Sequence, residues 1–142
     1  MKTLLVDRVE PYSPGDDCAS VTLRSAHGQI EAFCFARDLA EGELVENALS
    51  ALDAEIQAAH LSDWPEDLKA QRSVERMEKI GPYAYRGVGH VVDQAAGIIE
   101  VLGFRIDVGE VPCEGAVEFS FMRVEFHESV QPFAAADGYA AR

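Results

Sequence analysis

The stretch that decides the fold is "IIEVLGFRIDVG", residues 98–109, because it carries the strongest alternation of apolar and polar residues in the chain. Its apolar residues fall on one side of an extended chain: Leu102, Phe104, Ile106 and Val108. A period of two is the spacing at which side chains share one face of a β-strand. The sequence therefore predicts a half-buried strand here, and a core built on β-structure.

Similar patterns lie on both sides of this stretch. "YAYRGVGHVV", residues 83–92, precedes it across the turn "DQAAG". After the turn "EVPCEG" comes "AVEFSFMRVEF", residues 116–126, whose alternation changes phase near Phe121. Such a change predicts a β-bulge or a strand that is covered on both faces.

The first third of the chain also predicts strands. Leu4 to Val9 is apolar, "CASVTLRSA" and "QIEAFCFAR" alternate around a tight turn at His27-Gly28, and a short strand is expected around Leu44 and Val45. The turn "PYSPGDD" separates the first two strands, because its Pro, Gly and Asp residues favour turn geometry.

Two segments show helical spacing instead. Leu49, Leu52, Ile56 and Ala59 predict a short helix over 50–60, with a continued strand through "ENALSAL" as the alternative. The segment 62–80 predicts a longer helix, with Asp63 as N-cap and Gly81-Pro82 as its end.

The order of elements is three strands, a helical region and further strands, which resembles the topology of an OB-type barrel. The predicted fold class is therefore α+β and β-rich, a small OB-like barrel with one or two helices between the third and fourth strands. We expect a single globular domain over 1–128 and a flexible C-terminal tail over 129–142.

Charge limits the classes of partner. The chain has 142 residues, with 25 acidic and 12 basic side chains and a net charge of -13. A field of this sign repels phosphate backbones and anionic lipids, so neither nucleic acid nor a membrane is an expected partner. Without a signal-like or membrane-spanning run, and with three scattered cysteines that suit reduced thiols, we expect a soluble cytoplasmic protein.

The motifs for common cofactors and metals are incomplete. Gly87 and Gly89 form G-x-G, but the third glycine of a dinucleotide-binding loop is replaced by Val92. The four histidines are scattered without H-x-H or H-x-x-x-H spacing. We expect no cofactor and no metal, and a binding module rather than an enzyme.

The leading hypothesis is recognition of a basic protein partner. Acidic residues accumulate between Asp38 and Asp67 without any Lys or Arg, and Trp64 lies among them. An exposed Trp64 would be an interface anchor, whereas a buried one would fix the helix to the barrel. The proposed contact residues are Asp38, Glu41, Glu43, Glu46 and Trp64. A stripe of basic residues, opposite in charge to this acidic cluster, is expected along the helix predicted over 62–80: Lys69, Arg72, Arg76 and Lys79.

The alternative hypothesis is a small-ligand site or an active site behind "GPYAYRGVGHVVD", residues 81–93. Its candidate residues are Tyr83, Tyr85, Arg86, His90, Cys113 and His127. On an ideal strand the two tyrosines share one face, whereas Arg86 and His90 share the other. An uncovered edge strand would in addition favour a homodimer.

Overall fold

The computed structural model describes residues 3–14, 18–35 and 39–126, which form twelve strands and one short helix. The strands are β1 (Thr3–Pro11), β2 (Cys18–Arg24), β3 (Gln29–Phe35), β4 (Leu44–Glu46), β5 (Leu49–Leu52), β6 (Glu55–Ala58), β7 (Arg76–Lys79), β8 (Tyr85–Asp93), β9 (Ile98–Val101), β10 (Phe104–Asp107), β11 (Ala116–Phe121) and β12 (Arg123–Phe126). The helix is α1 (Glu66–Arg72).

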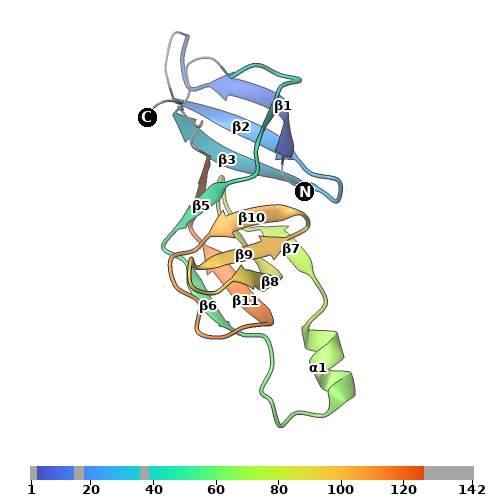
Figure 1. Cartoon of the computed structure of the whole chain (residues 1–142). Helices are drawn as coiled ribbons and strands as arrows, with labels where there is room; N and C mark the ends of the chain where they lie inside the picture. Colours follow the sequence, from blue (N-terminus) through green and yellow to red (C-terminus); the bar gives the residue numbers. More distant parts are fainter. Residues whose placement is uncertain (1–2, 15–17, 36–38, 127–142) are drawn as a thin grey trace, which may run out of the picture.

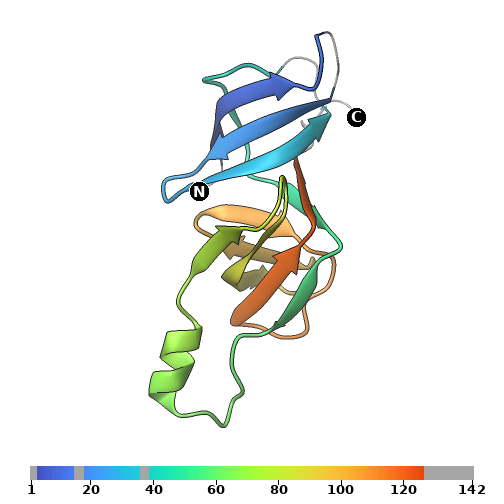
Figure 2. The ribbon, with the colours of Figure 1, turned by 180° about the vertical axis from the view of Figure 1, so that it is seen from behind.

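All strands belong to one mixed sheet. Its order is β4-β1-β2-β3-β12-β5-β10-β9-β8-β11-β6, and β7 pairs with β8 beside this path. The pairs β3–β12 and β5–β10 are parallel, and the others are antiparallel. Figures 1 and 2 show β1, β2 and β3 at one end of the molecule and α1 projecting from the other.

Two bends bring the halves of the sheet together. β11 and β12 are separated only by Met122, and β5 and β6 only by 53–54, where Asp53 has φ 55°. Across the bends, the amide of Met122 donates to the carbonyl of Leu52 at 3.2 Å. At the bend at Met122, β11 therefore pairs with β8 and β12 pairs with β3.

The core is continuous between the two halves. Residues from β1 to β3, such as Val6, Val21 and Leu23, belong to the same buried cluster as Phe104 and Phe121. The alternation predicted for β2 and β3 is confirmed, since Ala19, Val21 and Leu23 face Cys34, Ala32 and Ile30 across the ladder and all six are buried.

The predicted OB-like barrel is wrong. Within the described part of the chain, β4 pairs only with β1 and β6 only with β11, so these two ends of the sheet stay unjoined and the sheet is open. The barrel prediction depends on a helical region after the third strand, but only Glu66–Arg72 of that region is helical, and three short strands and their connecting loops form the rest. The β-rich character is confirmed, with a single short helix.

The helix predicted over 50–60 is wrong, because this segment forms β5 and β6. The alternative of a continued strand is right only in part: 49–52 is extended, but the strand is interrupted at 47–48, so that β4 and β5 pair with different neighbours. Leu49 is buried between the neighbouring strands β12 and β10, which supply ladder hydrogen bonds on both sides. The helical spacing of the apolar residues arises from two separate strands, because Leu49 and Leu52 lie in β5 and Ile56 lies in β6.

The helix predicted over 62–80 is too long. It covers only Glu66–Arg72, begins after Pro65 rather than at an Asp63 cap, and buries no residue. The second half becomes β7, because Gly87 in β8 lets the two backbones approach: a Cβ there would lie 2.0 Å from the carbonyl oxygen of Arg76. Sheet pairing overrides the helical spacing of the segment.

The stretch 98–109 contains a hairpin rather than one strand. Leu102 and Gly103 both have positive φ, 51° and 86°, and form the two-residue turn between β9 and β10. These angles match a type I′ turn, which suits the twist of paired strands. Phe104 and Ile106 are fully buried, so the predicted apolar face is confirmed beyond the turn.

The remaining sequence predictions divide by position. The turn at His27-Gly28 is confirmed by the bond from the amide of Ser25 to the carbonyl of Gly28 at 2.9 Å, and the phase change near Phe121 is confirmed as the break at Met122. The predicted tail over 129–142 lies outside the described residues. No helix among the described residues is long and apolar enough to cross a membrane.

Candidate functional sites

Two hollows lie on opposite faces of the short strand β7. Met77 and Lys79 line one, which we name the junction pocket because it lies between β1–β3 and β7–β8. Arg76 lines the other, named the strand groove because it crosses β6, β11, β8 and β7. The two faces follow from the period of two along β7.

The junction pocket has a volume of about 340 Å³ and is lined by both polar and apolar side chains. Arg8 and Glu10 form an ion pair of 2.8 Å at its rim, and Lys79 donates to Glu31 within it. Tyr85 contributes a buried ring whose hydroxyl oxygen accepts from the amide of Glu31 at 2.8 Å. The charges of the lining are therefore paired within the protein.

A chain of hydrogen bonds leads from this pocket to the surface. Ser20 Oγ donates to Glu31 Oε2 at 3.2 Å and lies 3.0 Å from the hydroxyl of Tyr83, which in turn is hydrogen-bonded to the hydroxyl of Tyr12. The rings of Tyr12 and Tyr83 both contact Phe33 edge-on, at centroid distances of 5.8 and 6.0 Å. The network joins β2, β3, β7 and the turn before β8.

Four groups of this network have pKa values displaced from their ordinary values. The hydrogen bond from Lys79 lowers the pKa of Glu31, and the same bond raises the pKa of Lys79. Burial raises the pKa of Tyr85, and partial burial with the hydrogen bond to Tyr83 raises the pKa of Tyr12 to about 12. Clusters of shifted groups beside a cavity are a common property of binding sites.

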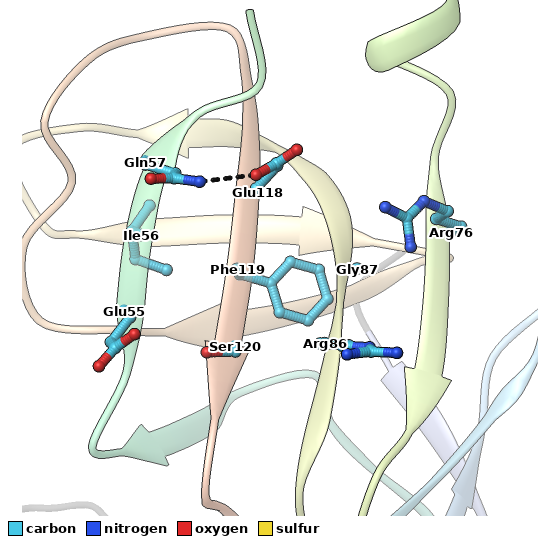
Figure 3. Close-up of a pocket in the computed structure, with 9 residues that line it drawn as sticks. All are labelled: Glu55, Ile56, Gln57, Arg76, Arg86, Gly87, Glu118, Phe119 and Ser120. Carbon is cyan, nitrogen blue, oxygen red and sulfur yellow. Dashed lines mark hydrogen bonds between the residues drawn. The ribbon is translucent and has the colours of Figure 1, made fainter.

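The strand groove has a volume of about 390 Å³ and is open along the sheet (Figure 3). Its walls carry Glu55 on β6 and Arg76 on β7, with Glu118, Ser120 and Arg86 between them. Gln57 Nε2 donates to Glu118 Oε1 at 2.7 Å, the bond drawn in Figure 3. The groove therefore combines both signs of charge with neutral hydrogen-bonding groups.

The residues of the small-ligand hypothesis are not all brought together. Tyr83 and Tyr85 join the junction network, whereas Arg86 lies in the strand groove and pairs with Glu78 at 2.9 Å. His90 is exposed, 3.9 Å from Glu100. Cys113 is half-buried beside the core, and His127 lies outside the described residues.

The residues of the acidic hypothesis are also separated. Glu41 and Glu43 precede β4 and accept from the amides of Val9 and Ala40, and Glu46 ends β4. Trp64 precedes α1 by two residues, and Arg72 lies 5.7 Å from its ring centroid. Figure 1 shows α1 at the end of the molecule opposite to β1. Asp38 lies outside the described residues.

The predicted basic stripe is divided as well. Lys69 and Arg72 are on α1, whereas Arg76 and Lys79 point to opposite faces of β7. Sequence reasoning missed Ser20 and Glu31 as site residues, because they occupy the outward positions of ordinary strands. Only their position opposite Tyr83 and Lys79 distinguishes them.

Comparisons with protein families, curated proteins and solved structures find no match to this chain. Across residues 3–14, 18–35 and 39–126, no group of three or more His, Cys, Asp or Glu side chains is arranged to hold a metal ion. Functional inference therefore depends on the two hollows and on the exposed edges of the sheet.

Proposed function

We propose that the protein binds a small uncharged polar molecule, such as a sugar or a polyol, in the junction pocket. The observation that carries this proposal is a cavity of about 340 Å³ whose two ion pairs, Arg8–Glu10 and Glu31–Lys79, are satisfied internally. A charged ligand would have to disrupt one of these pairs. An uncharged ligand can instead use the neutral groups of the lining.

Three neutral groups supply the contacts. Thr22 offers a hydroxyl and Gln29 an amide. The hydroxyl oxygen of Tyr85 already accepts from the amide of Glu31, so its proton is directed to another acceptor. Groups that both donate and accept hydrogen bonds suit a ligand rich in hydroxyls. The volume of about 340 Å³ lies within the range of about 300–1,000 Å³ that is typical of ligand sites.

The test is an NMR titration of the full chain with glucose, ribose and inositol as probes. We expect millimolar binding that shifts the amides around Glu31 and Tyr85. Thr22→Val should weaken it about threefold to tenfold, since one neutral hydrogen bond contributes about 0.5–1.5 kcal/mol. Thr3→Val is the matched control, because Thr3 lies on β1 outside the pocket.

The proposal is wrong if none of the three probes binds at millimolar concentration. It is equally wrong if glucuronate or glucosamine binds more tightly than glucose, because the pocket would then prefer a charge. Equal affinities of the Thr22→Val and Thr3→Val proteins would place the binding elsewhere.

A second proposal, recognition of a basic protein, is supported by the edge strand β4. Leu44 is 65% exposed there, and Glu43 and Glu46 flank it. An apolar residue framed by carboxylates on an edge strand suits a partner with complementary charge. This proposal is limited to the segment 41–46 and does not include Trp64.

Affinity capture at low and high salt tests the second proposal. The double variant Glu43→Gln/Glu46→Gln should lose a stoichiometric basic partner that the wild-type protein retains at low salt. Glu110→Gln/Glu114→Gln removes the same charge elsewhere and should retain it. If both double variants capture the partner equally, the β4 edge is not the contact.

A further inference from the structure

Two charged side chains of the strand groove have no partner within the described residues. The carboxylate of Glu118 is held by Gln57 at 2.7 Å and by Arg72 at 3.5 Å, and Arg86 is paired with Glu78. By contrast, Arg76 and Glu55 make no ion pair and no side-chain hydrogen bond in the part of the chain that the structure describes. They are the charges available to a ligand.

These two side chains stand on opposite walls. Glu55 is on β6 and Arg76 on β7, with β11 and β8 between them. Neighbouring strands lie about 4.8 Å apart, so the backbones of the walls are separated by roughly 14 Å. Figure 3 shows the guanidinium of Arg76 directed from β7 toward β8, with Glu55 diagonally opposite on β6, since the ladder puts Arg76 level with Gln57.

Neutral hydrogen-bonding groups lie between the walls, on β11, and on the β6 wall itself. Ser120 presents a hydroxyl and Gln57 an amide oxygen, since the amide nitrogen of Gln57 already donates to Glu118. Ser120 pairs with Glu55 on one side and with Arg86 on the other, so it lies one strand from Glu55 and two strands from β7. A negative charge at Glu55, neutral polar groups and a positive charge at Arg76 together complement an extended zwitterion.

We propose that the strand groove binds a short peptide through its two termini, with the carboxylate on Arg76 and the ammonium on Glu55. An extended residue spans about 3.3–3.6 Å, and the two protein side chains occupy part of the width, so two or three residues fit. The peptide groups between the termini meet Ser120 and Gln57. The occupant is thus a free dipeptide or tripeptide.

The net charge of the protein agrees with this choice. A net charge of -13 disfavours the approach of small anions, and Glu55 and Glu118 add to that repulsion within the groove. A zwitterion carries no net charge and is not repelled as a whole. It can satisfy Arg76 and Glu55 together, whereas a simple anion or cation satisfies only one of them.

Isothermal titration calorimetry with tri-alanine tests the proposal on the full chain. Unmodified tri-alanine should bind, and its C-terminal amide and its N-acetyl form should each bind about tenfold or more weakly, because charge-assisted hydrogen bonds are the strong ones. Arg76→Gln should remove the discrimination against the amide but keep that against the acetyl form. Glu55→Gln should do the reverse.

Matched controls are Arg105→Gln and Glu114→Gln, which change the same charges at exposed positions outside the groove. Both should bind tri-alanine like the wild-type protein. Thr22→Val should also leave this binding unchanged, so failure here is separate from failure at the junction pocket. If a groove variant does not fold, titration of the wild-type protein with the C-terminal amide and the N-acetyl form still shows whether it recognises the two charged termini.

The proposal is overturned if tri-alanine does not bind at millimolar concentration, or if both capped forms bind as well as the free peptide. Competition by acetate as effective as that by tri-alanine would reveal a simple anion site instead. The proposal is also contradicted if Arg76→Gln binds tri-alanine more weakly but still prefers the free carboxylate to the C-terminal amide.

Discussion

At the scale of single residues, Asn47 shows how a buried polar group holds a turn. It is 6% exposed, donates from Nδ2 to the carbonyl of Gly103 at 2.7 Å and accepts at Oδ1 from the amide of Arg105 at 3.0 Å. Ser25 and Glu75 bind the neighbouring Leu102, through its carbonyl and its amide. Three distant side chains thus hold Leu102 at a φ that non-glycine residues rarely adopt.

Asn47→Ala should destabilise the protein by about 2 kcal/mol or more, because it leaves a backbone donor and a backbone acceptor of the hairpin without their partner. Urea unfolding measures the change. Gln94→Ala, at an exposed turn position, should stay within about 0.5 kcal/mol of the wild-type protein. Equal effects of the two substitutions would show that the Asn47 bonds contribute no net stability.

The ion pair between Glu31 and Lys79 makes stability depend on pH. The pKa of Glu31 is lowered, so its contribution is present above the unfolded-state value near 4.5 and is lost as pH falls through the folded-state pKa. The pKa of Lys79 is raised, so its contribution is present below 10.5 and is lost as pH rises through the folded-state value.

Glu31→Gln should therefore reduce the loss of thermal stability between about pH 5 and pH 2. Thermal denaturation by circular dichroism across that range measures the slope. Glu114→Gln, an exposed carboxylate for which the structure records no such bond, should keep the wild-type slope. An unchanged slope in Glu31→Gln would mean that Lys79 does not hold Glu31 in its charged form.

At the scale of elements, β7 is extended because of its partner. The apolar residues Val74 and Met77 have a helical spacing, yet Met77 pairs with Gly87 in β8 and Val74 is 61% exposed. By contrast, β2 and β3 follow their own alternation, which already identifies the buried face. Elements with a strong local period could be predicted, and the one that depends on a glycine 11 positions downstream could not.

Gly87→Ala should weaken the pairing of β7 with β8, because the added Cβ would lie 2.0 Å from the carbonyl oxygen of Arg76. Overpacking of this kind costs about 1–3 kcal/mol. Hydrogen exchange should show lost protection in β7 as well as lower global stability.

Gly28→Ala is the control for this substitution, since its added Cβ would meet Leu102 at 3.5 Å, an ordinary contact. It should change stability by less than Gly87→Ala. Retained protection of β7 in the Gly87→Ala protein would show that the strand adapts without separating from β8.

At the scale of the whole molecule, charge opposes folding. A net charge of -13 on a compact chain produces self-repulsion, and salt screens it. The thermal midpoint should therefore rise between 20 mM and 500 mM sodium chloride, as measured by calorimetry. A falling midpoint would show that screened attractions, such as the Glu31–Lys79 pair, outweigh the repulsion.

The buried faces of β2, β3 and β10 and the net negative charge can be predicted from the sequence, because a period of two and a charge count are properties of neighbouring residues and of composition. The open sheet, the parallel pairing of β3 with β12, and the network of Ser20, Glu31, Lys79 and Tyr83 follow from the three-dimensional arrangement alone. These features depend on contacts between residues far apart in the chain. No local pattern encodes such contacts, since each outward side chain has the same spacing whatever lies opposite it.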